Sequence, residues 1–230
     1  MQCIKEIIDL KPRYKIFQLI KKYPGLHQKA IIKKSNYSEG TVRYHLDYFE
    51  KKELVSVSLT DKYKRYYVKD LISQKEKELL NVLRKKIPQN ITLYIMIYIA
   101  GSRVKISRSL EIHPKLVEYH LKNLVEAGVL KQIDTEKGII KIQTKFETIS
   151  KEFKISNNEV LYTLKDFYEI YNFFIKYSSN FIDKKLINDC LDWIDFLSDT
   201  VFPNKRKSTK SQIDKIENVL YNVFPHPYYS

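Results

Sequence analysis

Residues 41–55 read TVRYHLDYFEKKELV, and residues 116–130 read LVEYHLKNLVEAGVL. The two stretches share Val-x-Tyr-His-Leu at an offset of 75 residues, and the apolar positions that follow the leucine recur as well. Apolar residues at i, i+4 and i+7, here Val42, Leu46 and Phe49, are typical of a helix with one buried face. The sequence therefore predicts the same amphipathic helix twice, and such a repeat indicates the architecture before any single motif does.

The residues before the first copy predict two further helices. Pro12 opens a helical pattern with one apolar face, which Pro24 ends. A short helix is expected over 27–35, followed by a polar turn. Ser38 is well placed to be the N-cap of the repeated helix, which we expect over 40–52.

A hairpin is expected after the repeated helix. Two β-rich runs, 54–59 and 63–68, are separated by Asp61-Lys62, which is a turn signal. Three helices followed by a hairpin is the order of a winged helix.

The second copy has the same order of signals. Pro88 opens a helix, a short helix is expected over 103–110, and Pro114 opens the repeated helix. The second hairpin is expected over 130–144, with its turn at Glu136-Lys137-Gly138. Between the copies, residues 73–87 predict an amphipathic spacer helix.

The repeated helix and the residues after it carry a family resemblance. Val-x-x-His-Leu-x-x-Leu-x-x-x-Gly-Leu/Val resembles the recognition-helix pattern of winged helix-turn-helix regulators of the ArsR and MarR type. The second copy matches at Val117, His120, Leu121, Leu124, Gly128 and Val129. The first copy matches at Val42, His45, Leu46, Phe49 and Leu54, with Glu53 where the glycine would stand. The resemblance covers residues 12–145 and implies an archaeal-type transcription regulator with two tandem winged helices.

The exposed positions of the first repeated helix can read DNA. They are expected to be Ser38, Thr41, Arg43 and Tyr44, which supply hydroxyls, a guanidinium that can bind guanine with two hydrogen bonds, and a phenol. Basic residues flank them where phosphates of the same groove would lie. These are Lys29, Lys33 and Lys34 on the preceding helix, and Lys62, Lys64 and Arg65 at the expected wing tip.

The second copy has a weaker set of candidate DNA contacts. They are Lys115, Tyr119 and Lys122 on the repeated helix, with Arg103, Lys105 and Arg108 before it. Glu118 replaces Arg43, and a carboxylate beside phosphates is more often unfavourable than helpful. We therefore expect the first copy to read bases, and the second to hold the DNA backbone or a protein neighbour.

The charge of the chain is concentrated in its repeat-bearing part. The net charge is +14, and residues 1–150 hold 30 Lys and Arg against 16 Asp and Glu, whereas residues 151–230 hold 11 of each. A basic surplus of this size indicates a polyanionic partner such as nucleic acid. The neutral tail predicts helices over 158–183, 185–201 and 211–224, which could dimerise, bind an effector, or cap the winged helices.

Several other classes of protein are disfavoured. Only Cys3 and Cys190 are present, the most apolar run, 91–100, is about half the length that crosses a bilayer, and no signal peptide is apparent. These features indicate a cytoplasmic protein. No glycine-rich phosphate loop, metal-ligand spacing or nucleophile motif is found, so we expect no enzyme, cofactor or metal site. His45 and His120 are expected to be partly buried packing residues.

The expected fold is mainly α with small β-hairpin wings: a first winged helix (1–72), a linker helix with a second winged helix (73–150), and a helical domain (151–230). The expected function is a sequence-specific regulator of transcription that binds double-stranded DNA, is a homodimer through its C-terminal helices, and could contact the transcription machinery. The alternative is an adaptor in a chromosome or transcription assembly, whose tandem winged helices bind proteins.

Overall fold

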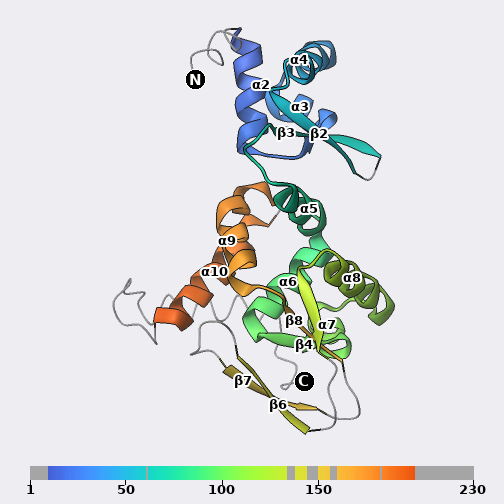
Figure 1. The fold of residues 1–230 in the computed structure, drawn as a ribbon, viewed down its shortest axis with the longest axis vertical. Coiled ribbons are helices and arrows are strands. Elements are labelled where there is room, and N and C mark those ends of the chain that lie inside the picture. The colour runs from blue at the N-terminus through green and yellow to red at the C-terminus, as the bar shows by residue number, and fades with distance from the viewer. Residues whose placement is uncertain are drawn as a thin grey trace. The chain divides into compact units, whose positions relative to one another are not determined.

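The structure is a computed structural model that describes residues 10–60, 62–133, 138–143, 150–155, 160–181 and 183–199. The chain forms two compact units, Met1–Asn81 and Val82–Ser230. Their elements are labelled in Figure 1. The sequence predicted three parts, with boundaries after residues 72 and 150; in the structure, every described helix and strand from α6 (Lys86–Tyr98) onward falls in the second unit.

In unit 1 (Met1–Asn81), the described residues before the linker helix form three helices and a three-stranded antiparallel sheet. In chain order its elements before the linker helix are α2 (Lys11–Lys22), β1 (Leu26–His27), α3 (Gln28–Ser35), α4 (Glu39–Lys51), β2 (Val55–Thr60) and β3 (Tyr63–Val68). The sheet order is β1-β3-β2. The sequence prediction of three helices and a hairpin is confirmed, and residues 61 and 62 separate the two hairpin strands where the turn was expected.

The core of unit 1 sets the orientation of α4. Val42, Leu46 and Phe49, the predicted i, i+4, i+7 set, are fully or almost fully buried. They pack in one cluster with residues of α2, including Phe17, whose ring meets that of Phe49 edge-on at 5.5 Å. Because this stripe faces the core, the opposite face of α4 is exposed to solvent.

A short turn fixes where α4 begins. Asn36 ends α3 in the left-handed conformation, with φ 58°. Ser38 then accepts a hydrogen bond from the backbone N–H of Thr41 at 3.2 Å, as expected of the predicted N-cap. This turn leaves the first residues of α4 on the surface.

The linker helix α5 (Gln74–Leu83) crosses the boundary between the units. It begins with a reciprocal cap in which Glu76 accepts from the backbone N–H of Ser73 and Ser73 accepts from the backbone N–H of Glu76. The expected spacer helix over 73–87 is thus confirmed at its start but ends earlier. The next helix begins before Pro88, which is buried in its first turn.

Unit 2 (Val82–Ser230) repeats the element order of unit 1. The elements are α6 (Lys86–Tyr98), β4 (Ala100–Ser102), α7 (Arg103–Leu110), α8 (Pro114–Glu126) and β5 (Leu130–Ile133). The apolar set Val117, Leu121 and Leu124 of α8 is completely buried, as its counterpart is in α4.

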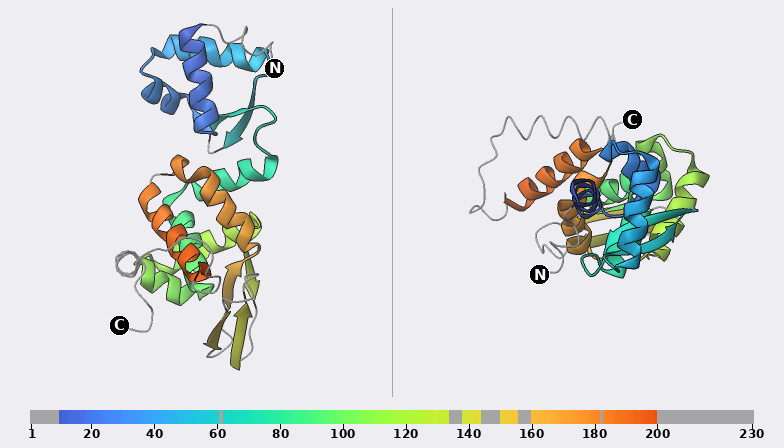
Figure 2. Two further views of the ribbon diagram at one scale, coloured as in Figure 1. Left: turned by 90° about the vertical axis from the view of Figure 1, so that its left-hand side faces the viewer. Right: turned by 90° about the horizontal axis from the view of Figure 1, so that it is seen from above.

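The hairpin predicted over 130–144 is wrong. β5 pairs with β8 (Leu161–Leu164), and β6 (Gly138–Gln143) pairs with β7 (Ser150–Ile155); β6 and β7 lie side by side in both Figure 1 and Figure 2. Gly138 begins a strand rather than closing a turn. β5 pairs with a strand some 30 residues later in the chain, in which Leu161 and Leu164 are buried. A turn signal in the local sequence does not indicate such a distant pairing.

The strand pairing of unit 2 nevertheless matches that of unit 1. In unit 1, Val55 pairs with Val68; in unit 2, Leu130 pairs with Leu164. From unit 1 to unit 2, the residue number therefore rises by 75 in the first strand of the pair and by 96 in the second. The same shifts relate the pair Leu26 and Tyr66 to the pair Gly101 and Tyr162. The paired residues are therefore 21 positions further apart along the chain in unit 2 than in unit 1, and the segment between β5 and β8 contains β6 and β7.

The tail helices are α9 (Phe167–Tyr177) and α10 (Lys184–Asp199), with a short 3-10 turn (Ser178–Asn180) between them. The helix predicted over 158–183 is wrong in its first part, because residues 161–164 form β8. The helix predicted over 185–201 is confirmed as α10, whereas the one predicted over 211–224 lies outside the described residues. Cys190 is buried. No helix among the described residues is both long and apolar enough to cross a bilayer.

Candidate nucleic-acid interface

The outer face of α4 carries the predicted reading residues. Arg43 and Tyr44 are exposed, and Thr41 is half-buried. Arg43 donates from Nη2 to Oε1 of Glu39 at 3.2 Å, and the two side chains are 64% and 65% exposed. An exposed i,i+4 pair of this kind contributes only about 0.3–0.5 kcal/mol, so the guanidinium can exchange this partner for a stronger one.

A cleft of about 300 Å³ lies beside this face of α4. Its lining comes from the start of α3, the first turns of α4 and the wing, which is the hairpin β2–β3. The lining residues are His27, Gln28, Lys29, Glu39, Arg43, Lys62, Tyr63 and Lys64. The cleft thus gathers cations from three separate parts of the sequence, against one carboxylate.

Four predicted contacts meet in this cleft, namely Lys29, Arg43, Lys62 and Lys64. The other predicted residues of α3, Lys33 and Lys34, are exposed in its last turn and are absent from the lining. The ammonium of Lys34 lies 4.5 Å from the centre of the Tyr23 ring.

Two aromatic residues of the cleft, His27 and Tyr63, were not predicted from the sequence. His27 is the N-cap of α3, and its Nδ1 accepts from the backbone N–H of Ala30 at 3.3 Å. The imidazole lies against the ring of Tyr63, with the ring centres 5.2 Å apart. This contact joins the start of α3 to the wing and so shapes the cleft. The antiparallel pairing of β1 with β3, 36 or more residues apart, brings them together and leaves no local signal in the sequence.

Two of the predicted wing cations have partners within the protein. Lys64 donates to Oε2 of Glu50 at 3.3 Å on the surface. Arg65 lies within β3 rather than at the wing tip, it is half-buried, and its Nη1 donates to the carbonyl oxygen of Gly25 at 3.1 Å. Its place in the strand makes Arg65 a support for the loop before β1, and we correct its assignment to the wing tip.

The repeated Tyr-His pairs have the same arrangement in both units. Tyr44 is exposed and meets the ring of His45 edge-on at 5.2 Å, and Tyr119 meets His120 likewise at 5.1 Å. His45 is buried, and the burial together with the nearby charge of Arg13 lowers its pKa from the ordinary value. Burial and then Lys85 lower the pKa of His120. Within the described part of the chain, no group of three potential ligands could hold a metal ion.

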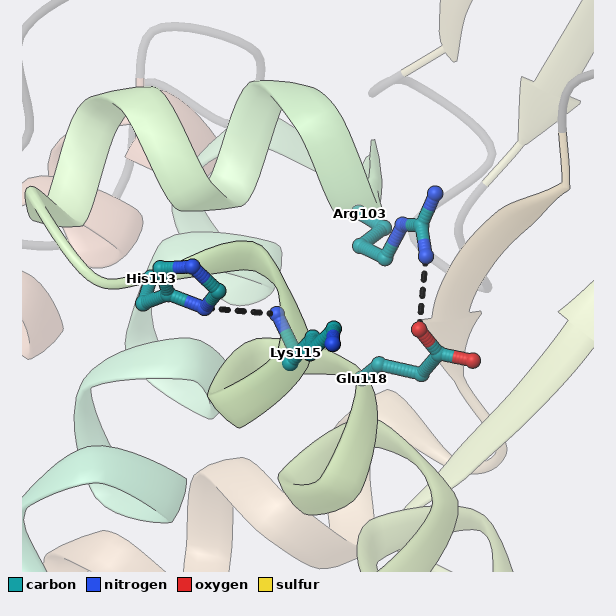
Figure 3. Close-up of polar contacts among 4 residues, drawn as sticks. All are labelled: Arg103, His113, Lys115 and Glu118. Atoms are coloured by element: carbon teal, nitrogen blue, oxygen red, sulfur yellow. Dashed lines mark hydrogen bonds and ion pairs between the residues drawn. The ribbon is translucent and has the colours of Figure 1, made fainter.

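The counterpart surface of unit 2 differs in its charges. Arg103 on α7 donates to Oε2 of Glu118 on α8 at 2.6 Å, as Figure 3 shows. The structurally equivalent positions in unit 1 hold Gln28 and Arg43. Glu118 and Arg103 therefore neutralise one another, and Arg103, a predicted DNA contact, already has an anionic partner.

The remaining predicted residues of unit 2 lie on the same two helices, α7 and α8. Four of them are exposed and Lys105 is half-buried; the exposed ones are Arg108, Lys115, Tyr119 and Lys122. The N-cap of α8 is His113, and its Nδ1 accepts a hydrogen bond from the backbone N–H of Lys115 at 3.3 Å (Figure 3). Val104 and Leu116 are exposed where unit 1 has Lys29 and Thr41. This face therefore has exposed apolar side chains where unit 1 has a lysine and a threonine, and a carboxylate at the position of Arg43.

The comparisons with known proteins give one match, which lies in unit 1. No curated protein matches the chain. Residues 11–56 match the model of a family described as winged helix-turn-helix DNA-binding, and the match runs from α2 to the start of β2. The element order, the buried stripe of α4 and the family match lead to one conclusion: unit 1 has the fold of a winged helix-turn-helix, and its residues 11–56 are similar to a family of DNA-binding domains.

Proposed function

We propose that the protein is a sequence-specific regulator of transcription that binds double-stranded DNA through unit 1. In this proposal α4 enters the major groove, Arg43 and Tyr44 meet base edges, and the wing holds the phosphate backbone. The observation that carries the proposal is the cationic cleft, because it places lysines of α3 and the wing next to the exposed face of α4.

The chemistry of the cleft favours a phosphate backbone. Four cations and one carboxylate line it; Arg43 is paired with Glu39, and Lys64 with Glu50, both in exposed ion pairs. Guanidinium and ammonium groups release counterions from DNA when they bind phosphates, which makes the affinity depend steeply on salt. A protein-docking surface of ordinary composition would instead have few charges at its centre.

Selection of bound duplexes from a random-sequence pool tests the proposal, followed by fluorescence anisotropy titrations of the full chain at several salt concentrations. We expect an enriched sequence motif, and a log-log salt slope of about −0.9 per phosphate contact. A pool that shows no enrichment would contradict a sequence-specific regulator.

The cleft itself is tested by replacing both wing lysines, Lys62 and Lys64, with alanine. The salt slope should become shallower by about two, one for each lost phosphate contact, while the preferred sequence is kept. Lys51→Ala with Lys52→Ala is the matched control, because these exposed lysines lie at the opposite end of α4. An equal change of slope in both double variants would show that general charge, and not the cleft, attracts the DNA.

We further propose that unit 2 is a second copy of the winged helix that does not read bases. The matching strand pairing supports the duplication, and the Arg103–Glu118 ion pair supports the loss of base reading. In this proposal unit 2 holds the DNA backbone. The exposed apolar residues Val104 and Leu116 favour the alternative, in which unit 2 docks a protein.

The proposal includes a homodimer formed through the tail helices. Tyr168 and Ile175 lie seven residues apart on α9, hence on one face, and both are exposed. Light scattering coupled to size-exclusion chromatography should give the mass of two chains, and Ile175→Asp should reduce it to one. A wild-type mass of one chain at micromolar concentration would exclude this dimer.

A further inference from the structure

We propose that Gly40 is the point of closest contact between α4 and DNA, where the absent side chain lets the helix backbone approach the major-groove edge of a base pair. This inference rests on the proposed function of unit 1, and it adds a residue that the sequence analysis did not assign to the interface.

Gly40 has no evident role within the protein. A Cβ built at Gly40 would meet no heavy atom of the described residues within 4 Å, whereas one at Gly101 would lie 2.7 Å from the ring of Tyr94. Gly25 and Gly128 have positive φ angles, of 76° and 71°, which favour glycine for conformational reasons. Neither reason applies to Gly40, which is the second residue of α4.

Glycine at this place has a cost that needs a compensating benefit. In a helix, glycine is less favourable than alanine, because it loses more backbone freedom on folding. The space around Gly40 would accept alanine without any clash. The glycine is therefore better explained by contact with a binding partner than by packing within the protein.

The neighbours of Gly40 indicate what the outside partner is. Glu39 and Arg43 line the cationic cleft, and Tyr44, one turn after Gly40, is exposed. Residues at the start of a recognition helix lie nearest to the base edges, and phosphates of the same groove would occupy the cleft. A glycine there lets the helix backbone come closer to a base pair than any side chain would allow.

Unit 2 lacks this close approach. The position equivalent to Gly40 is Lys115, whose side chain is exposed at the start of α8 (Figure 3). A long side chain at that place would hold the helix away from base edges, although its ammonium could reach a phosphate. The two units thus differ at the position of closest approach as well as at Arg43 and Glu118.

Two variants of the full chain test the inference, with affinity measured on the selected duplex and on its scrambled counterpart. Gly40→Ala should leave the melting temperature equal or higher, yet weaken binding to the selected duplex by about tenfold or more. Gly40→Lys, which copies unit 2, should abolish the preference for the selected duplex while keeping affinity for the scrambled one. Lys115→Ala is the matched control and should leave that preference unchanged.

The possible failures can be told apart. If Gly40→Ala binds the selected duplex as tightly as the wild type, Gly40 is not a contact, and the proposed function stands. If Gly40→Ala lowers the melting temperature, the glycine has a structural role and the inference is overturned. If the wild type itself does not distinguish the two duplexes, the proposed function fails, and this inference fails with it.

Discussion

Arg43 and Glu118 occupy equivalent positions in the two units. They differ in charge, and they also differ in where their ion-pair partners lie. Arg43 is paired along one helix with Glu39, and both side chains are about two-thirds exposed. Glu118 is paired across two helices with Arg103, at 2.6 Å, with side chains 59% and 48% exposed. The guanidinium of Arg43 can turn to a base edge, because its partner lies on the same exposed surface. The carboxylate of Glu118 instead ties α7 to α8.

At the residue scale, Ser38 has a structural role that can be separated from DNA binding. Its Oγ caps α4 and also lies 2.8 Å from Oγ1 of Thr41. Ser38→Ala should lower the free energy of unfolding by about 1 kcal/mol, because the cap is lost. Ser38→Asp should retain the stability, since aspartate is an equally good cap, but should weaken DNA binding because it places a negative charge beside phosphates. Urea unfolding and anisotropy titrations measure the two effects. If Ser38→Asp bound DNA as tightly as the wild type, the start of α4 would lie away from the phosphates.

His45 should make the stability of the protein depend on pH. Burial lowers its pKa in the folded state below the ordinary value of 6.5, so the unfolded chain binds a proton more readily. The free energy of unfolding should therefore be highest above pH 6.5, and should fall as the pH drops below that value until the folded-state pKa is passed. Urea unfolding at pH 7.5 and 5 measures this loss. His45→Gln should reduce it, and an equal loss in both proteins would show that other groups cause it.

At the scale of elements, the sequence predicted those that have local signals. The buried stripe, the N-cap and the turn after β2 are all encoded within a few residues, so α4 and the hairpin β2–β3 were predicted correctly. The partner of β5 was predicted wrongly, because strand pairing depends on burial across the sheet and not on the nearest turn.

In the candidate site, too, the residues with local sequence signals were predicted, and those that depend on strand pairing were not. Lys29, Arg43, Lys62 and Lys64 were predicted from charge and helix position, and the structure brings them to one cleft. The contact between His27 and Tyr63 depends on the pairing of β1 with β3, and no local pattern indicates it. Arg65 was misplaced, because a strand alternates its faces and only the pairing register shows where each residue lies.

The pair of helices α7 and α8 yields a prediction about unit 2. Glu118→Ala should leave Arg103 without its carboxylate and able to bind a phosphate, so the salt slope of DNA binding should become steeper by about one. The stability should change by less than about 1 kcal/mol, because the pair is largely exposed. Titrations of DNA binding at several salt concentrations provide the measurement, and Arg103→Ala is the control, with no steeper slope expected. An unchanged slope in Glu118→Ala would place this face away from DNA and favour the protein-docking alternative.

At the scale of the whole molecule, the net positive charge is larger in residues 1–75 than in residues 76–150. Residues 1–75 carry 17 Lys and Arg against 8 Asp and Glu, and residues 76–150 carry 13 against 8. The larger surplus belongs to the segment that contains the family match and the cationic cleft. This difference in charge supports the proposal that unit 1 reads bases and that unit 2 has a supporting role.

The most direct test of this assignment compares Arg43→Ala with the wild type on the selected duplex and on its scrambled counterpart, at one fixed salt concentration. We predict that Arg43→Ala loses about 1–3 kcal/mol of binding free energy on the selected duplex and much less on the scrambled one. The ratio of the affinities for the selected and the scrambled duplex should therefore become smaller. An equal loss on both duplexes, or no loss on either, would contradict base reading by α4.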